Sequence, residues 1–426
     1  MKKQIISILI VAMALATAWA VRGQFGHEQG AAWAGGVGAL ALILASGRKD
    51  WYRKIFTVTL ASAVGWGAGG MISYGIVVGY GRSVSFENAF YGLLMLFVIG
   101  GLYGLMGGGL VGLSLDSSSK RKVNWGLLMA EMAAGGLLCY YLLVVQLEYL
   151  MTPPRGEMWS ACLGAGLAML WHMVRHKFHA PVRVALFAAL GAGFGFAFGN
   201  FCQTIGTVLE IKFNMWNVME YNIGFWGGAG MAYGVFSSKW DEQSEAPQPW
   251  ESRIAMLLVF VALPLINFFD SMGYQTLMKR INPAANPEMV STLSTITSAF
   301  IILAVAVVGV WKYSKLKSGF ERKDVLLLLG VYLAAYISCS YIVSGLYAGT
   351  LLLNHHLYWL NFLVIFWLMS KQVSAFGAHP ESEINMKRWL TYVACAVAVI
   401  LLLAIVSVST HGEMPGAHDR FPALFF

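Results

Sequence analysis

The sequence predicts an all-α polytopic integral membrane protein. Only 12% of its 426 residues are charged and 58% are hydrophobic, whereas soluble globular chains carry about 25% charged residues. The apolar residues form long uncharged runs, and a run of about 18 residues is long enough to cross the hydrocarbon core as a helix. Lys and Arg residues lie mainly between these runs, on alternate loops. Together these observations indicate many membrane-spanning helices.

We expect thirteen spans. They are predicted at residues 4–21, 31–47, 55–80, 89–114, 125–149, 158–174, 182–206, 221–238, 253–273, 290–311, 324–347, 351–370 and 389–408. The first run follows a basic start and ends in Ala18-x-Ala20, which is also the pattern of a cleavable signal peptide. Cleavage after Ala20 would leave twelve spans and change no later loop.

The distribution of basic residues sets the orientation. With the N-terminus inside, 22 of the 29 Lys and Arg residues fall on the inner side, as cytoplasmic loops require. We therefore expect a multi-pass protein of the bacterial inner membrane, with a cytoplasmic N-terminus and a periplasmic C-terminus. This bias accounts for the pI near 9.1, so the bilayer is the expected partner and nucleic acid is not.

Glycine divides the chain into two parts. Of 47 glycines, 38 precede residue 241, where the hydrophilic segment 239–253 begins. We predict a glycine-rich domain of eight helices at 1–238, a cytoplasmic linker at 239–253, and a five-helix domain with an outer C-terminal tail at 254–426.

Several glycines recur every four residues. The first strip is Gly100, Gly104, Gly108 and Gly112, and a second is Gly191, Gly195 and Gly199. Such strips let helix backbones approach closely in lipid; smooth faces of this kind can also slide, as alternating access requires. Segments 65–80 and 90–115 are echoed at 193–209 and 216–238, which predicts a parallel repeat of four helices each, 1–120 and 121–238.

The stretch "VRGQFGHEQG" at 21–30 places three ionisable residues between two uncharged runs. Arg22, His27 and Glu28 lie on the outer side, and Arg155 and Glu157 occupy the fainter echo of this stretch. Ionisable groups at membrane depth are costly and commonly functional. These five residues are candidates for a substrate-binding group or an outer gate, and the alternative is a pair of solvated turns.

Other polar residues lie within the spans. Glu131, Asp270, His355 and His356 are candidates for proton coupling, although Glu131 is also placed to reach the basic membrane edge. Glu148, Glu210 and Glu220 are expected at the outer interface. Three helix faces carry hydroxyl and amide groups that either line one outer cavity, with Tyr336, Ser340 and Tyr358 as binding residues, or join helices by hydrogen bonds. The members of these faces are Tyr336, Ser340, Ser344, Tyr347, Asn354, Tyr358, Asn361, Asn267, Asp270 and Tyr274.

No catalytic motif is present, and the five cysteines form no C-x-x-C pair. We expect neither a cofactor nor a metal, and no enzymatic activity. The leading hypothesis is a secondary transporter or permease for a small polar solute, anionic or sugar-like, with proton coupling. The alternatives are a membrane-embedded transferase or hydrolase acting on a lipid-linked substrate from the outer side, and a membrane assembly subunit without transport. The sequence does not indicate the oligomeric state.

Overall fold

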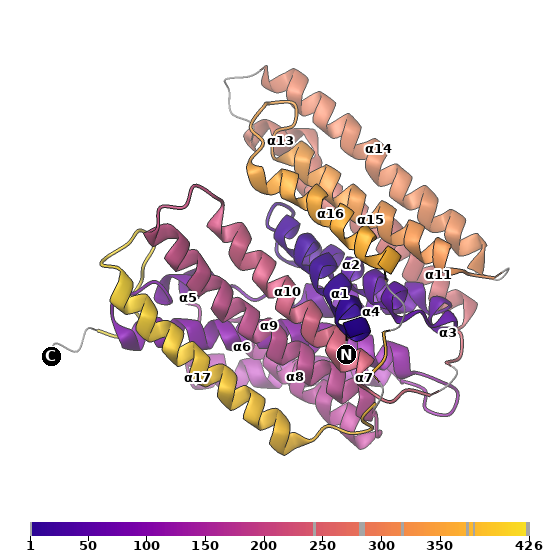
Figure 1. The fold of residues 1–426 in the computed structure, drawn as a ribbon, viewed down its shortest axis with the longest axis horizontal. Coiled ribbons are helices and arrows are strands. Elements are labelled where there is room, and N and C mark those ends of the chain that lie inside the picture. The colour runs from indigo at the N-terminus through magenta and orange to yellow at the C-terminus, as the bar shows by residue number, and fades with distance from the viewer. Residues whose placement is uncertain are drawn as a thin grey trace.

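The computed structural model describes residues 2–241, 244–280, 286–316, 319–371, 375–377 and 380–422, and every regular element in these ranges is a helix (Figure 1). Lys317, one of the residues that set the orientation, lies outside them. The helices of the first part are α1 Lys2–Arg22, α2 Glu28–Ser46, α3 Lys49–Tyr52, α4 Ile55–Gly70, α5 Gly75–Tyr80, α6 Phe86–Asp116, α7 Trp125–Tyr140, η1 Tyr141–Gln146, α8 Met158–Arg175, α9 His179–Val208 and α10 Met215–Phe236. The remaining helices are α11 Pro249–Leu257, η2 Leu258–Ala262, α12 Leu263–Asn267, η3 Phe268–Met272, α13 Tyr274–Arg280, α14 Pro287–Ser314, α15 Arg322–Val343, α16 Leu353–Lys371 and α17 Met386–Thr410.

The predicted all-helical membrane class is confirmed. Each of the thirteen predicted segments is helical, but within the described ranges nine helices are long and apolar enough to cross a membrane. The count of thirteen is therefore not confirmed. Segment 55–80 is interrupted between Gly70 and Gly75, where the chain leaves α4 and starts α5.

Polar caps determine where several helices begin. The side chains of Ser85, Asn124, Asn214, Asn286 and Asn385 each accept a hydrogen bond from a backbone N–H in the first turn of the helix that follows. These groups satisfy N–H donors that have no partner inside the helix. Such residues mark the starts of helices at the two membrane faces.

Six helices form a closed ring. Going round it, α1 packs against α2, α2 against α4, α4 against α6, α6 against α9, α9 against α10, and α10 against α1. The α7–α8 hairpin lies outside the ring, with α8 against α6 and α9. Because α1 and α2 belong to the ring and their expected counterparts α7 and α8 do not, the repeat is not confirmed.

Glycine lies at each of these six contacts. The strip at Gly100 and Gly104 faces the α9 backbone at Ala192 and Ala188, and Gly191 faces the α10 backbone at Trp226. The other contacts use Gly30 between α1 and α2, Gly35 between α2 and α4, Gly65 between α4 and α6, and Gly224 between α10 and α1. The glycine strips thus bring helix backbones into direct contact, as the sequence predicts for packing in lipid.

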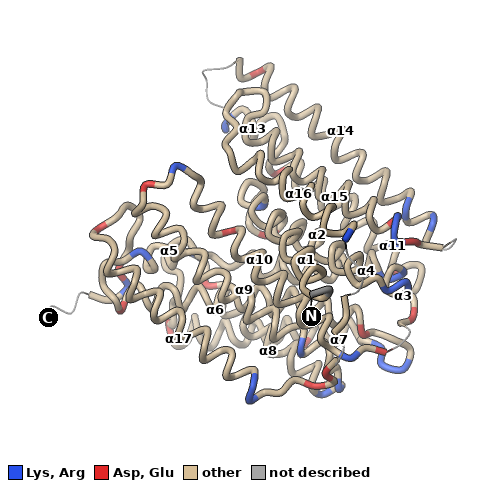
Figure 2. Tube along the Cα trace, viewed as in Figure 1, with Lys and Arg blue, Asp and Glu red and all other residues tan. Residues whose placement is uncertain are grey.

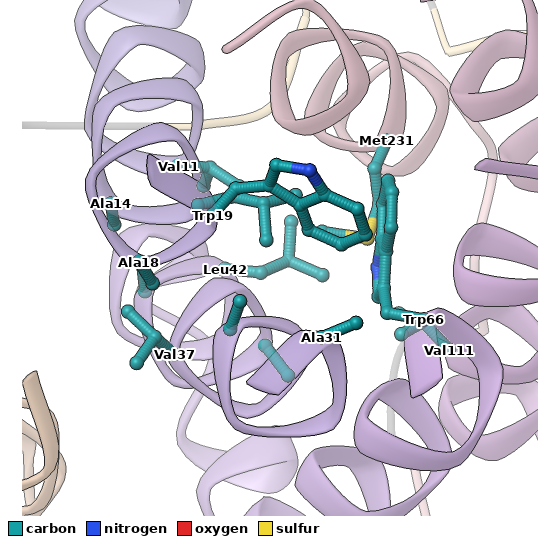
Figure 3. Close-up of a cluster of buried hydrophobic side chains, with 14 of the residues drawn as sticks. Val11, Ala14, Ala18, Trp19, Ala31, Val37, Leu42, Trp66, Val111 and Met231 are labelled. Atoms are coloured by element: carbon teal, nitrogen blue, oxygen red, sulfur yellow. The ribbon is translucent and has the colours of Figure 1, made fainter. Parts of the chain in front are cut away.

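Aromatic side chains fill the centre of the ring. Trp66 extends from α4 to the backbone of α10 at Gly227, and its ring centroid lies 5.2 Å from that of Trp19 on α1 (Figure 3). Tyr103 from α6 lies 5.6 Å from Trp19 and 6.0 Å from Phe196 of α9. All four side chains are fully buried, so the interior of the ring is a packed core.

The later helices form a second group along one side of the ring (Figure 1). In this group α15 contacts α1 and α2, and α16 contacts α1. The last helix, α17, instead packs on α6 and α9. The division at the 239–253 linker therefore stays a prediction, because α17 follows the linker in sequence but lies against helices that precede it.

The two ends of the bundle differ in charge. Lys and Arg gather around α3, α11 and the loops beside α7 (Figure 2). We call this end the basic face; it carries the segment 47–54, which includes α3, and the loops at 117–124 and 244–248. The opposite face carries the turns at 23–27, 81–85, 147–157 and 209–214.

A valine at position 104 should destabilise the fold much more than one at position 101. A side chain at Gly104 collides with the Ala188 carbonyl of α9, whereas at Gly101 the nearest atom is the Ala189 carbonyl oxygen, 3.7 Å away. Overpacking of this kind costs about 1–3 kcal/mol. Both substitutions change helix propensity equally, so thermal unfolding of the two variants in one detergent isolates the packing difference. Equal losses would contradict the close α6–α9 contact.

Candidate functional site

A buried ion pair lies on the opposite face, at the end of the ring. Arg22 is the last residue of α1, and its Nη2 donates to Oε2 and Oε1 of Glu220 on α10, at 2.8 and 3.1 Å. Tyr74, from the break between α4 and α5, donates to Glu220 Oε1 at 2.6 Å and accepts from Arg22 Nη2 at 3.0 Å. The guanidinium carbon also lies 4.8 Å from the Trp19 ring centroid. This triangle joins two helices of the ring, α1 and α10, to the segment that follows α4.

Burial makes this pair sensitive to loss of either partner. The Arg22 side chain is 1% exposed and that of Glu220 is 7% exposed. Taking two charges out of water costs several kcal/mol per ion, which good geometry and added hydrogen bonds offset. The Glu220 carboxylate accepts hydrogen bonds from Arg22 and Tyr74, so the cluster is suited to holding helices together.

The rest of the 21–30 stretch binds the later helices. Gln24 Oε1 accepts from the Ser340 hydroxyl of α15 at 2.8 Å, and the Gln24 amide nitrogen lies 3.1 Å from His355 Nε2 of α16. Gln29 Nε2 donates to Asp270 at 2.6 Å, and the Gly30 carbonyl accepts from Tyr336 at 2.9 Å. The stretch is therefore the junction between the ring and the second group of helices.

The predicted polar faces contribute to these interhelical contacts. Tyr358 accepts from Asn217 of α10 at 2.5 Å and donates to the carbonyl of Ala20 at 3.3 Å. Tyr336 also stacks on Trp33 of α2, with centroids 4.6 Å apart. Tyr336, Ser340, Tyr358 and His355 are buried, and their partners are neighbouring helices. The sequence left two interpretations of these faces, an outer cavity or hydrogen bonds between helices. These contacts are of the second kind.

Two proton-coupling candidates form local contacts elsewhere. Glu131 of α7 accepts from His172 Nδ1 of α8 at 2.6 Å and also binds Arg175. This contact joins the two helices that lie outside the ring. His356 is exposed, and its Nδ1 lies 2.6 Å from the Tyr341 hydroxyl.

The turn at residues 155–157, which weakly repeats the sequence of the 21–30 stretch, has a different role in the fold. The Glu157 carboxylate accepts from the backbone N–H of Met151 at 2.9 Å, from that of Thr152 at 2.8 Å, and from the Trp159 indole at 2.6 Å. It thereby orders its own turn. Arg155 is exposed on that turn. Arg22 is paired with Glu220, whereas Glu157 binds its own turn. These contacts therefore do not form the expected group of Arg22, Arg155 and Glu157.

His27 and Glu28 are exposed beside the buried pair. His27 Nδ1 lies 3.4 Å from Arg22 Nη1, and its ring meets Tyr74 edge-on. Desolvation by the surrounding protein, together with the Arg22 charge, holds the pKa of His27 below its ordinary value of 6.5; Arg155 acts in the same direction. Protonation of Nδ1 would direct an N–H group at the Arg22 guanidinium, so the neutral ring fits this position.

The expectation that Glu220 lies at the interface is wrong. It is buried because α10 is enclosed between α1 and α9, which brings its first turns against Arg22. Tyr74 was not among the predicted residues. One sequence signal was available: the predicted topology places both Arg22 and Glu220 at the outer end of a span, where opposite charges can pair.

Within the described residues, no cluster of three or more His, Cys, Asp or Glu side chains is placed to hold a metal ion. The five cysteines are free thiols, of which Cys162 and Cys339 are buried.

Residues 181–248 match a family model described as "Photosynthesis affected mutant 68". The matched segment comprises most of α9, all of α10 and the start of the linker, and so includes Glu220. No curated protein and no solved structure matches the chain. The match spans less than half of the chain and is a likeness of this segment.

The prediction of a secondary transporter or permease is wrong. The description of the matched family refers to photosynthesis and names no transported solute. The predicted location in the bacterial inner membrane is corrected on the same finding. Of the three hypotheses, the membrane assembly subunit without transport agrees best with the match, and the packed interior of the ring is consistent with that reading.

Replacing Glu220 with Gln should destabilise the protein by about 3–5 kcal/mol, because it leaves the Arg22 charge buried without its counter-ion. The double variant Arg22→Met with Glu220→Met should recover much of this loss. The free energy of unfolding in one detergent measures both. Arg155→Met, at an exposed arginine on the same face, is the control and should change stability by about 0.5 kcal/mol or less. An Glu220→Gln loss no larger than that of the control would contradict a structural ion pair.

Acidification should destabilise the protein partly through His27. Its folded-state pKa is lowered, so the unfolded chain takes up the proton first and stability falls as pH decreases through about 6.5. His27→Gln should therefore lose less thermal stability than the unchanged protein between about pH 7 and about pH 5. His411→Gln, in the C-terminal tail, controls for the substitution itself. The same loss in both variants would show that His27 does not titrate as described.

Proposed function

We propose that the protein is a membrane assembly factor without transport activity, acting on a complex of a photosynthetic membrane. The observation that carries this proposal is the match of residues 181–248 to the photosynthesis family, because these residues form the central hairpin of the fold. In the ring, α9 and α10 lie between α6 and α1. The segment that resembles the family thus belongs to the core of the molecule.

The packed ring supports an assembly role over a transport role. Transporters place their substrate sites in cavities near the bilayer midplane, between helices. At the centre of this ring the fully buried Trp19 and Trp66 lie against each other, and the Arg22–Glu220 pair lies at its end. A rigid bundle of this kind suits a protein that presents surfaces to partners.

The matched hairpin carries such a surface. Aromatic rings follow one another along α9 and α10: Phe194 lies 5.2 Å from Trp226 and 5.6 Å from Phe198, and Phe225 lies 5.7 Å from Trp226. Trp226 is 37% exposed, and the other three are partly exposed. Aromatic side chains are enriched in the energetically dominant parts of protein interfaces. We propose that this aromatic ladder contacts a helix of the assembling complex.

We also propose that the chain has no catalytic activity of its own. Its buried ionisable side chains are largely engaged in structural pairs: Arg22 with Glu220, and Lys312 with Asp324 at 2.6 Å. A general base must lie within hydrogen-bond reach of substrate, and these buried carboxylates face their partner cations.

We also propose that the chain crosses the membrane thirteen times. The four segments beyond the nine apolar helices are α4–α5, α8, α10 and α16. The strongest case is α10, which contacts α1 and α9 along the ring. Its polar residues Asn217 and Glu220 lower its hydropathy but are paired with neighbouring helices. We propose that all four cross the membrane with their neighbours.

Deleting the gene in the source organism should lower the amount of at least one photosynthetic complex. Native gel separation of solubilised membranes measures these complexes, and the full-length tagged chain should migrate with an incomplete form of the affected complex. Restoring the unchanged gene should restore the complex. Normal complexes in the deletion strain, or a source organism without photosynthetic complexes, would overturn the proposal.

The aromatic ladder can be tested with matched variants in the same strain. Trp226→Ala should weaken complex accumulation, whereas Trp367→Ala, at a Trp of α16 that is 59% exposed, should restore it fully. Both remove an indole from the surface, so equal effects would contradict a specific role for the hairpin. Thermal unfolding of both purified variants checks that neither effect arises from misfolding.

A further inference from the structure

A cavity of about 490 Å³ opens on the basic face, away from the Arg22–Glu220 pair. It lies between α4, α6, α7 and α11, under the linker residues 245–248. Its volume is within the range of small-molecule sites. None of the predicted site residues lines it, and it belongs to neither the ring core nor the aromatic ladder.

The cavity is amphipathic along its depth. Its mouth is lined by Lys54, Lys122 and the serines of segment 117–119, and its inner walls by Leu60, Val64 and Met129 among other apolar side chains. From Lys54 to Val64 the α4 axis rises by about 15 Å, which is half of the roughly 30 Å hydrocarbon core. The cavity therefore has the depth of one leaflet, with its polar end where headgroups lie.

Apolar side chains at its inner end are also exposed on the surface of the bundle. Val64 on α4 is 45% exposed, Met129 on α7 is 40% exposed and Ile254 on α11 is 47% exposed, and all three line the cavity. Apolar side chains that line a cavity and are exposed at membrane depth allow an acyl chain to enter from the lipid phase.

The mouth favours a negatively charged headgroup. The first residue or cap of three helices lines it: Lys54 before α4, Trp125 of α7 and Gln248 before α11. Helix N-termini carry a partial positive charge and bind anions such as phosphate. Lys122 is exposed at this position, and basic pockets between membrane helices bind lipid headgroups.

Two carboxylates, those of Glu245 and Glu251, also line the mouth, and hydrogen bonds from neighbouring groups hold each of them in place. Glu245 accepts from the backbone N–H of Ser119 at 2.6 Å and from its hydroxyl, and Glu251 accepts from the backbone N–H of Gln248 at 2.8 Å. Lys54 Nζ donates to the carbonyls of Leu115 at 2.8 Å and Ser117 at 2.6 Å. Burial lowers the pKa of Lys54 to about 8, and an adjacent phosphate would favour its charged form.

We propose that this cavity binds one glycerophospholipid, with its phosphate at Lys122, Ser117, Ser118 and the N-termini of α4 and α7, and one acyl chain between α4, α7 and α11. This site is separate from the proposed assembly function and does not depend on it. The bound lipid would fill the space between the α7–α8 hairpin and the first helix after the linker, and so join two parts of the chain that lie outside the ring.

The test uses the delipidated full-length chain in detergent, titrated with phosphatidylglycerol carrying brominated acyl chains. Trp125 and Trp250 line the cavity, so binding should quench tryptophan fluorescence and saturate. Lys122→Glu should weaken binding about tenfold, and Ala61→Trp should abolish it by filling the apolar end. Native mass spectrometry should detect one retained phospholipid in the unchanged protein and less in both variants.

Each cavity substitution has a control, which is the same type of substitution at a position outside the cavity. Lys371→Glu reverses an exposed charge on the basic face, and Ala398→Trp adds an indole to the exposed side of α17; both should bind like the unchanged protein. Free inorganic phosphate should not displace the lipid. Displacement by inorganic phosphate alone, equal binding of an uncharged diacylglycerol, or equal binding in the cavity and control variants would each overturn the proposal. Lys122→Glu is a surface change, so the test stands even where Ala61→Trp misfolds.

Discussion

Direct backbone contact at glycine is the constraint on which the rest of this structure depends. Lipid supplies no hydrophobic force that drives one helix onto another, so packing and hydrogen bonds must hold helices together. All six contacts of the ring use glycine to bring backbones together. That closeness leaves a narrow interior, which Trp66 and Trp19 fill. In this ring, closed by glycine contacts, the two buried indoles occupy the centre.

Close packing also explains why charges can be buried at the ends of the ring. Arg22 and Glu220 are brought together because α10 lies against α1. Arg183 at the basic end is likewise buried, and it binds Ser237, Ser238 and Glu381. At both ends of the ring, the buried arginine has hydrogen-bonding partners that offset the free-energy cost of removing its charge from water. These contacts tie the family-matched hairpin to the chain before and after it.

Much of the fold was predictable because it follows from local pattern. Long apolar runs gave helices in each expected segment, and strips such as Gly100–Gly104 predicted close contacts that α6 and α9 make. The site was less predictable. Arg22 was identified as a key residue, but its partner Glu220 lies 198 positions away, and no local pattern shows which helix packs beside α1. Tyr74 has no sequence signal at all.

The sequence by itself determined that the chain is helical and suited to a membrane, with a glycine-rich first part and one basic face. These properties depend on composition and spacing along the chain. Only the tertiary structure decided that "VRGQFGHEQG" is a junction, with Arg22 bound to α10 and Gln24 to α15. It also decided that the lipid-sized cavity lies elsewhere, at Lys54 and Lys122. The physical reason is that both features are built from side chains on helices that meet only when the bundle closes.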